Sequence, residues 1–388
     1  MRDIIGIICE YNPFHKGHKY QIDKIREMMP EATLIGIMSG NVVQRGELSL
    51  VDKYVRALIA SECGLDGVFE IPYPYCGSTA EIFASAGVEI AYNLGCNYIC
   101  FGTENSSVEK LEKIADIIDT NEFKAEVEKK TREDINHLKA KELALKGLGY
   151  EMPEYSNDIL ALEYIRAIKN KSINLKYFTV ERVGARYNDI TENEIMSASA
   201  IRAYFHKQGK ITSIPDCVKP YYDRLINEGN YVISNEINDF LYHYAVITPR
   251  EVFDDCFDSC SEIGAIIKDA SKNAKNSEEF FNYLNSKSYT TSRIKRVLLY
   301  ALTGICEVDK TPLFSILLSS NDKCKELLKN IRKNESFLVI TKMADSKKLD
   351  EKSKKQLDAL LKLDELYVTF LKSKKAPKSV YGFNPILK

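Results

Sequence analysis

Alternation between short apolar runs and helical segments is the feature that most constrains the fold of this chain. Four runs have the length and continuous hydrophobicity of strands that are buried on both faces; they span residues 3–10, 32–40, 66–73 and 97–102. Three segments of helical character separate them, at residues 18–29, 52–63 and 79–93. Such alternation is typical of a parallel sheet, because each parallel connection has to cross back over the sheet. We therefore predict an α/β fold with a doubly wound parallel sheet.

The pattern changes after about residue 210. Before that point the alternation continues with a helix at 157–169, a fifth strand at 174–182 and a helix at 197–209. Beyond "SIPDCV" the strand signals fade, and helical segments follow, for example at "TTSRIKRVLLYALTGI" (290–305). We therefore place a domain boundary near 210, with a first domain over 1–210 and a mainly α-helical C-terminal region over 211–388.

Composition indicates a multidomain globular protein. The chain has 388 residues, of which 45% are hydrophobic and 28% are charged, and this balance disfavours disorder. Apolar runs fall short of the roughly 18 residues of a membrane span, and the start lacks the long apolar stretch of a signal peptide. The ten cysteines contain no Cys-x-x-Cys spacing, so we expect reduced, structural thiols. The expected compartment is the cytoplasm, without a membrane partner.

Positive charge gathers at the C-terminal end of the chain. The net charge is −1 overall, but residues 321–388 contain 17 Lys and Arg against 9 Asp and Glu. Such a segment can bind a polyanion. Each individual lysine run is also typical of a solvated helix face, and that alternative stays open.

The loop "EYNPFHKGH" after the first strand carries the strongest chemical signal. Its two histidines, His15 and His18, are two of only five in the chain. In alternating α/β sheets, ligands bind at the carboxyl ends of the strands. Gly17 permits close backbone approach where a helix begins, and a helix N-terminus attracts phosphate. Two imidazole donors can stabilise charge on a phosphoryl group, so we predict a nucleotide site.

Structural roles for the same residues remain alternatives. Asn12-Pro13 can form a simple turn, His18 can cap a helix, and Phe14 can belong to the core. A zinc site is disfavoured, because Glu10 is the one nearby carboxylate and no cysteine has suitable spacing. We therefore predict no metal held by protein ligands.

The motif His15-Lys16-Gly17-His18 resembles the His-x-Gly-His signature of the HIGH-superfamily nucleotidyltransferases. The stretch "MSASAIR" (196–202) resembles their second motif, Ile-Ser-x-Thr-x-Ile-Arg, with Met196 in place of Ile and Ser199 in place of Thr. A serine at a helix start and an arginine one turn later can both donate to phosphate. This likeness implies the Rossmann-like HIGH-superfamily nucleotidyltransferase fold.

Four stretches together resemble one family within that group, the tRNA(Met) cytidine acetate ligases. In chain order they are "EYNPFHKGH", "MSGNVVQRGE" (38–47), "FEIPY" (69–73) and "FGTEN" (101–105). The resemblance is dense over residues 1–205 and thinner afterwards. It implies an enzyme that forms acetyl-adenylate from acetate and ATP. The acetyl group then passes to the wobble cytidine of elongator tRNA(Met), which gives N(4)-acetylcytidine.

The resemblance also implies roles for individual residues. His15, His18 and Arg202 are the expected catalytic residues, with the histidines on the ATP phosphates. The implied ATP-binding residues are Ile7, Ile8, Cys9, Glu10, Tyr11, Asn12, Pro13, Phe14, His15, Lys16, Gly17, His18, Lys19, Tyr20, Gly102, Asn157, Arg182 and Ser199. For Gly102 a strand-end turn is an alternative, and for Asn157 and Arg182 a helix cap or a surface charge.

Substrate and tRNA contacts are expected in two places. Gln44 and Arg45 follow the second strand and can contact the acetyl-adenylate or the cytosine, or lie in a solvated loop. Lys53 and Arg56 follow on the next helix, where a surface position is equally compatible. Arg293 and Arg296, together with the basic tail, are candidates for tRNA contacts. By the resemblance, residues 1–210 form the ATP-binding catalytic domain and 211–388 the tRNA-binding region.

Two other functions remain compatible with the residues. An adenylyltransferase acting on a small phosphorylated substrate needs the same first domain, but not a long basic extension. A non-catalytic RNA-binding protein needs no phosphate donors, and His15, His18 and Arg202 weigh against it. The sequence leaves undecided the oligomeric state and whether a magnesium ion accompanies the ATP.

Overall fold

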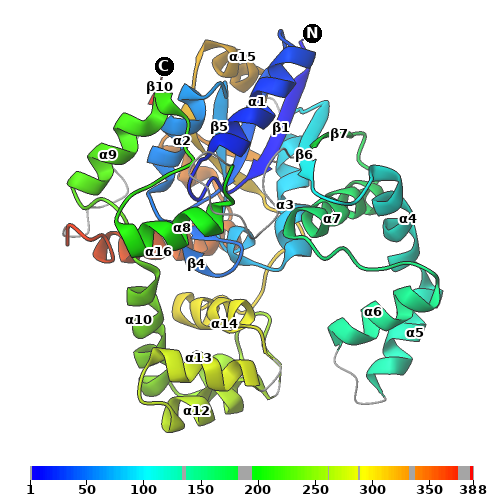
Figure 1. Cartoon of the computed structure of the whole chain (residues 1–388), viewed down its shortest axis with the longest axis vertical. Coiled ribbons are helices and arrows are strands. Elements are labelled where there is room, and N and C mark those ends of the chain that lie inside the picture. The colour runs from blue at the N-terminus through cyan, green and yellow to red at the C-terminus, as the bar shows by residue number, and fades with distance from the viewer. Residues whose placement is uncertain are drawn as a thin grey trace.

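An eight-stranded sheet lies within the upper half of the molecule as drawn in Figure 1, a view of the computed structural model. The structure describes residues 2–132, 137–181, 195–260, 262–286, 289–331, 337–374 and 385–387. The strand order is β10-β8-β5-β2-β1-β6-β7, and β9 pairs with β8. The strands of this sheet are β1 (Ile4–Cys9), β2 (Thr33–Ser39), β5 (Gly67–Ile71), β6 (Tyr98–Thr103), β7 (Lys176–Glu181), β8 (Phe314–Ser320), β9 (Leu338–Ile340) and β10 (Ile386–Leu387).

The five strands expected from the sequence form the parallel part of this sheet. β1 pairs in parallel with β2 on one side and with β6 on the other. β5 extends the parallel pairing beyond β2, and β7 extends it beyond β6. All residues of β2 and β5 are buried, which matches their continuous apolar runs. Successive strands therefore lie on both sides of β1, so the doubly wound prediction is confirmed and the change of direction falls between β1 and β6.

Helices of the first part begin and end where local sequence chemistry favours it. They are α1 (Lys16–Met28), α2 (Lys53–Glu62), α3 (Ala80–Asn93), α4 (Val108–Ile118), α5 (Asn121–Thr131), α6 (His137–Gly147), α7 (Ser156–Lys171) and α8 (Ala198–Gln208). Ser197 caps α8 by accepting from the Ala200 N–H, and Gly209 ends it in the left-handed region at φ 67°. α1 begins two residues before the expected start, because His15 is its N-cap.

The second part is mainly helical, as expected, and it also supplies strands to the central sheet. Its helices are α9 (Lys219–Asn227), α10 (Ser234–Ile247), α11 (Arg250–Asp254), α12 (Ile263–Asn273), α13 (Ser277–Ser286), α14 (Thr291–Thr303), α15 (Asp322–Ile331) and α16 (Glu351–Thr369). β8 joins the sheet antiparallel to β5, and β9 and β10 pair with β8. The division at residue 210 thus stays a prediction, and the sheet is built from both sides of it.

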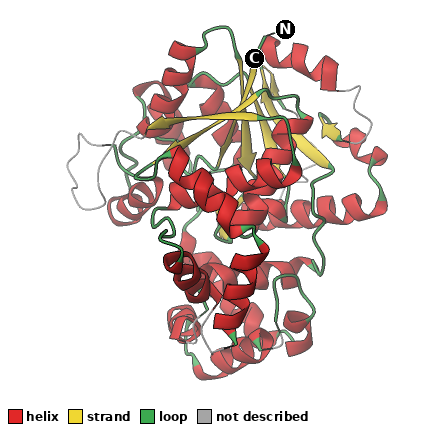
Figure 2. Cartoon of the chain, turned by 90° about the vertical axis from the view of Figure 1, so that its right-hand side faces the viewer, coloured by secondary structure: helices red, strands yellow, loops and turns green. Residues whose placement is uncertain are grey.

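Two helical lobes extend from the layer that contains the sheet. In Figure 1 the lobe with α10, α12, α13 and α14 lies below it, and α5 and α6 form a second projection. Figure 2, turned by 90°, shows the strands gathered in the upper half and helices alone in the lower part. Among the described residues, no helix is both long and apolar enough to cross a membrane.

Candidate active site

A cavity of about 400 Å³ opens at the carboxyl ends of β1 and β6, where the strand order changes direction. Its wall includes the β1–α1 loop, the small hairpin of β3 (Val42–Val43) and β4 (Glu47–Leu48), the start of α3, the ends of β6 and β7, the start of α7 and the start of α8. His15, His18, Ser199 and Arg202 all belong to its wall. The two motifs singled out in the sequence, about 180 residues apart, therefore meet at one site.

The two histidines form a stacked pair at the start of α1. Their ring centroids are 3.7 Å apart with an interplanar angle of 23°. The Nδ1 atom of His15 accepts from the Gly17 N–H at 3.0 Å, and the Nδ1 atom of His18 accepts from the His15 N–H at 3.2 Å. Because a neutral imidazole carries its proton on the other nitrogen, both rings present Nε2–H as the donor.

Aromatic side chains hold His18 in this position. The Tyr11 ring lies 4.8 Å from the His18 ring and the Phe14 ring lies 5.5 Å from it, as centroid distances. Phe14 is in turn fixed through its N–H, which donates to the Tyr222 hydroxyl at 3.0 Å. The imidazole pair is therefore oriented before any ligand arrives, which lowers the entropic cost of binding.

Gly17 is required sterically beside this pair. A Cβ atom on Gly17 would lie 2.9 Å from Cε1 and 3.1 Å from Nδ1 of His15. The His15 side chain is only 1% exposed, so it has little room to move. The glycine of the His-x-Gly-His motif thus makes space for the histidine ring itself.

The start of α8 is tied to the β1–α1 loop by several hydrogen bonds. Arg202 donates from Nη1 to the Asn12 carbonyl at 2.7 Å. Ser213 bridges the two segments. Its carbonyl accepts from the Lys16 N–H at 2.9 Å, and its hydroxyl oxygen accepts from the Met196 N–H at 3.0 Å. Helix starts are rich in N–H donors, so two helix N-termini that can attract phosphate are locked in a fixed relation.

Arg56 and Glu10 connect the ends of neighbouring strands under the cavity. Arg56 is fully buried and donates to the backbone carbonyls of Glu10 and Gly40. The Glu10 carboxylate accepts from the Gln44 N–H at 2.8 Å, which holds the hairpin against the end of β1. Burial raises the pKa of Glu10, and the nearby guanidinium of Arg202 opposes that rise.

The opposite wall is formed by the loop after β6 and the start of α7. Asp158 is 1% exposed, and its carboxylate accepts from the backbone N–H groups of Glu104, Asn105 and Ser106 at 2.7 to 3.1 Å. Asn157 donates to the Glu104 carboxylate. Arg45 reaches across from the hairpin and donates to the Ser156 hydroxyl at 3.2 Å.

Most of the ATP-binding residues implied by the resemblance lie on the cavity wall. Those that line it are Ile8, Cys9, Glu10, Tyr11, Asn12, His15, Gly17, His18, Tyr20, Gly102, Asn157 and Ser199, and the hairpin adds Gln44 and Arg45. Ile7, Pro13 and Phe14 are buried behind the wall, Lys16 is exposed, and Lys19 pairs with Asp23. Arg182 lies outside the described residues.

Arg293 and Arg296 are not part of the cavity wall and lie on α14 in the helical lobe, although Arg296 lies close to Gly46 of the hairpin. Both approach Asp258: Arg293 Nε is 3.5 Å and Arg296 Nη2 is 3.6 Å from its carboxylate. Arg296 is only 8% exposed, whereas Arg293 is partly exposed. The structure thus leaves Arg293 as the more accessible of the two candidates for a tRNA contact.

For several residues the sequence did not predict the position or the role that the structure shows. Lys53 and Arg56 are buried rather than at the surface, and Asp158 and Ser213 organise two walls. For Asp158 the sequence carries a weak signal, an acidic residue in the first turn of a helix. For Ser213 we find none, because its role depends on a left-handed conformation at φ 55°.

Among the described residues, no group of three or more His, Cys, Asp and Glu side chains has an arrangement that could hold a metal ion.

Comparisons with known proteins agree with this geometry. A family model described as HIGH Nucleotidyl Transferase matches residues 2–380. A tRNA(Met) cytidine acetate ligase from Caldanaerobacter subterraneus is 33% identical, with 100% of both chains covered. One from Clostridium perfringens is 32% identical, with 99% of both covered. The crystal structure of Thermotoga maritima TmcAL bound with alpha-thio ATP superposes with a TM-score of 0.89 at 26% identity, covering 99% of both chains.

Proposed function

The chain belongs to the tRNA(Met) cytidine acetate ligase family of HIGH nucleotidyl transferases, and on that premise we propose its reaction. It joins acetate to the AMP part of ATP and transfers the acetyl group to the wobble cytidine of elongator tRNA(Met). One observation carries the proposal: the imidazole pair and the Ser199–Arg202 helix start line the same cavity. A Thermotoga maritima relative of the same fold is named as bound to an ATP analogue.

In the first step an acetate oxygen attacks the α-phosphorus of ATP. A new P–O bond forms to acetate, the bond to the β-phosphate oxygen breaks, and pyrophosphate leaves. Negative charge builds on the phosphates, and the Nε2–H groups of His15 and His18 are suited to donate to them. Arg202 adds a guanidinium to the same wall and is held by Asn12. The site works mainly by orientation and charge stabilisation.

In the second step the exocyclic amine of cytidine attacks the acetyl carbon, and AMP leaves with the oxygen that joined it to the acetyl group. The amine loses one proton as the amide forms. Gln44 and Arg45 lie on the hairpin at the edge of the cavity, where an incoming base would enter. The Gln44 amide donates to the Ser78 carbonyl at 3.0 Å and is partly buried, whereas Arg45 is exposed and its guanidinium has several further donors, so Arg45 is the better candidate for contact with RNA.

Contacts to the rest of the tRNA are proposed for the second part of the chain. Lys347, Lys348, Lys355 and Lys372 are exposed there, and cations of this kind supply salt-dependent affinity for phosphates. Arg332 and Lys333 lie outside the described residues. A tRNA substrate is consistent with the cytoplasm as the expected compartment.

The test is pyrophosphate exchange into ATP, measured with and without acetate, followed by acetyl transfer to tRNA. We expect exchange that depends on acetate. Exchange that requires a small phosphorylated substrate instead would identify an adenylyltransferase, and absence of exchange under all conditions would favour a non-catalytic RNA-binding protein.

His18→Ala is expected to abolish exchange while the protein stays folded, because it removes one donor of the pair and the acceptor for the His15 N–H. The matched control is His243→Ala, an exposed histidine on α10 outside the cavity, which should keep wild-type exchange. Full exchange activity in His18→Ala would show that the phosphate site is wrongly assigned.

A further inference from the structure

The hairpin segment, residues 41–50, forms one edge of the cavity and is anchored at both ends. At its base, the Ser49 N–H donates to the Asn41 carbonyl at 2.9 Å. The Leu50 N–H donates to the Asn12 side chain at 2.8 Å, which ties the segment to the loop that carries the histidines. Arg45, at the tip between β3 and β4, is exposed. Whatever fixes Asn41 therefore fixes the start of this segment.

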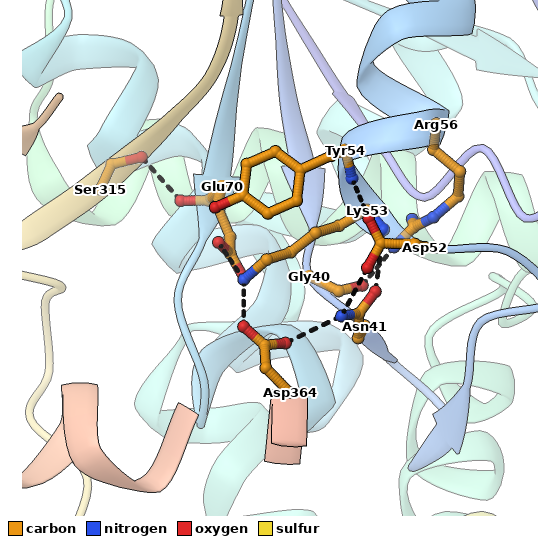
Figure 3. A network of polar contacts seen from close by, with 9 residues as sticks. All are labelled: Gly40, Asn41, Asp52, Lys53, Tyr54, Arg56, Glu70, Ser315 and Asp364. Atoms are coloured by element: carbon orange, nitrogen blue, oxygen red, sulfur yellow. Dashed lines mark hydrogen bonds and ion pairs between the residues drawn. The ribbon is translucent and has the colours of Figure 1, made fainter. Parts of the chain in front are cut away.

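Asn41 belongs to a buried group of polar side chains that we call the Lys53 cluster: Asn41, Lys53, Glu70 and Asp364 (Figure 3). The Lys53 ammonium contacts both Glu70 oxygens, at 2.9 and 2.8 Å, and one Asp364 oxygen at 2.5 Å. Lys53, Glu70 and Asp364 are 1 to 3% exposed. Buried charges require well-placed partners, so this group has a single favourable arrangement.

The cluster joins four elements that are distant in sequence. Asn41 follows β2, Lys53 begins α2, Glu70 lies on β5, and Asp364 lies on α16, 311 residues after Lys53. Glu70 comes from the "FEIPY" stretch and Asn41 from the start of "MSGNVVQRGE", and neither residue lines the ATP cavity. Gly40 leaves the space that the Glu70 carboxylate occupies, because a Cβ there would lie 2.2 Å from a Glu70 oxygen.

The Asn41 side chain links the Lys53 cluster to the start of the hairpin segment. Its Oδ1 accepts from the Lys53 N–H at 2.8 Å, and its Nδ2 donates to Asp364 Oδ1 at 2.9 Å. Asp364 therefore holds the first residue of the segment directly, and holds Lys53 as well. Through these contacts the C-terminal helix α16 reaches the base of the hairpin segment, which in turn lines the cavity.

We propose that Asp364 is a positioning residue: it holds the hairpin segment over the cavity, so that α16 helps to retain the acetyl-adenylate until the cytidine amine attacks. The identity of the retained intermediate rests on the proposed function. The positioning of the segment does not, and it is tested separately.

The first experiment measures opening of the hairpin segment by limited trypsin digestion. Cleavage after Arg45 is followed by mass spectrometry in the wild type and in Asp364→Asn. We expect cleavage to be about tenfold faster in the variant, because a charged hydrogen-bond partner of Asn41 and Lys53 is lost. The matched control is Asp358→Asn, an exposed carboxylate on the same helix, which should behave as the wild type.

The second experiment measures retention of the intermediate, as pyrophosphate released per acetyl group transferred to tRNA. We expect Asp364→Asn to raise this ratio several-fold, whereas a purely structural role would lower both quantities together. An unchanged ratio in the folded variant overturns the proposal, and so does unchanged cleavage after Arg45. Asn41→Ala is the second variant, because it removes the hydrogen bonds from the Asn41 side chain to Asp364 and Lys53 without changing a charge. If the wild type does not acetylate tRNA, the proposed function fails, while the digestion still tests the positioning.

Discussion

At the residue scale, the structural and the chemical explanations of the histidine pair turn out to be compatible. His15 does cap a helix, a structural role that the sequence indicated for His18. Because the cap uses Nδ1 of each ring, it also fixes Nε2 as the protonated nitrogen. A capping contact therefore prepares the donor that a phosphate needs.

Gly17→Ala is expected to damage nucleotide binding with little effect on folding. The new Cβ would fall 2.9 Å from the His15 ring, which cannot shift without breaking its stack on His18. Relief of this contact shifts the His15 ring. Because a shifted ring no longer aligns its donor with the reacting groups, we expect kcat/KM for ATP in the exchange reaction to fall by at least about tenfold.

The control for this substitution is Gly147→Ala, at the end of α6, where a Cβ meets no other atom within 4 Å. It should leave exchange unchanged. Wild-type kinetics in Gly17→Ala would mean that the stacked pair is not the phosphate site.

Residues of the two motifs could be predicted from the sequence because local chemistry defines them. A glycine, a helix start and a pair of donors all lie within a few positions. The burial of Lys53 and Arg56 could not be predicted, because a charged side chain is buried only if partners elsewhere in the fold compensate it. For Lys53 those partners come 17 and 311 residues later.

At the element scale, the important relation is between the starts of α1 and α8. Each helix has good local signals, and both were predicted. Their mutual position depends on Ser213, which accepts from the backbone of both segments. Helix boundaries are therefore readable from sequence, while the contact that aligns two helix ends is a tertiary feature.

Ser213→Ala is expected to loosen this alignment. The partly buried Met196 N–H loses its partner, and the loss of one hydrogen bond costs about 1 kcal/mol of unfolding free energy. We expect a small decrease in the denaturation midpoint and a rise of about fivefold in KM for ATP, because the phosphate donors of α8 are displaced.

Ser271→Ala is the matched control for that variant. Ser271 is also buried and hydrogen-bonded, to the Lys268 carbonyl within α12 in the helical lobe. It should show a similar loss of stability with an unchanged KM. An unchanged KM in Ser213→Ala would contradict the alignment role.

At the scale of the whole molecule, the sheet draws its strands from both ends of the chain. The parallel strands were predicted from their continuous apolar runs. β8, β9 and β10 were not, because β9 and β10 have only three and two residues and β8 is rich in serine. Pairing of β8 with β5 joins residues about 250 positions apart, which no local pattern encodes. The contact between Asp364 on α16 and Lys53 likewise joins the two ends of the chain.

This long-range contact predicts a pH dependence of stability. Burial raises the pKa of Glu70 from 4.5 to about 7; Lys53 and Arg56 oppose the rise and Asp364 adds to it. The folded protein therefore keeps a proton that the unfolded chain has already lost. Stability from this group is greatest below about pH 4.5 and is lost as the pH rises to about 7.

Glu70→Gln removes this titration and should flatten that part of the stability curve. Because the folded protein holds this proton more tightly than the unfolded chain does, we expect the wild type to lose more stability than the variant over this interval. Urea denaturation at a series of pH values measures the difference. Glu151→Gln, at an exposed position, should follow the wild type. Parallel curves for the wild type and Glu70→Gln would show that Glu70 stays ionised in the folded protein, with Lys53 outweighing the combined effect of burial and Asp364.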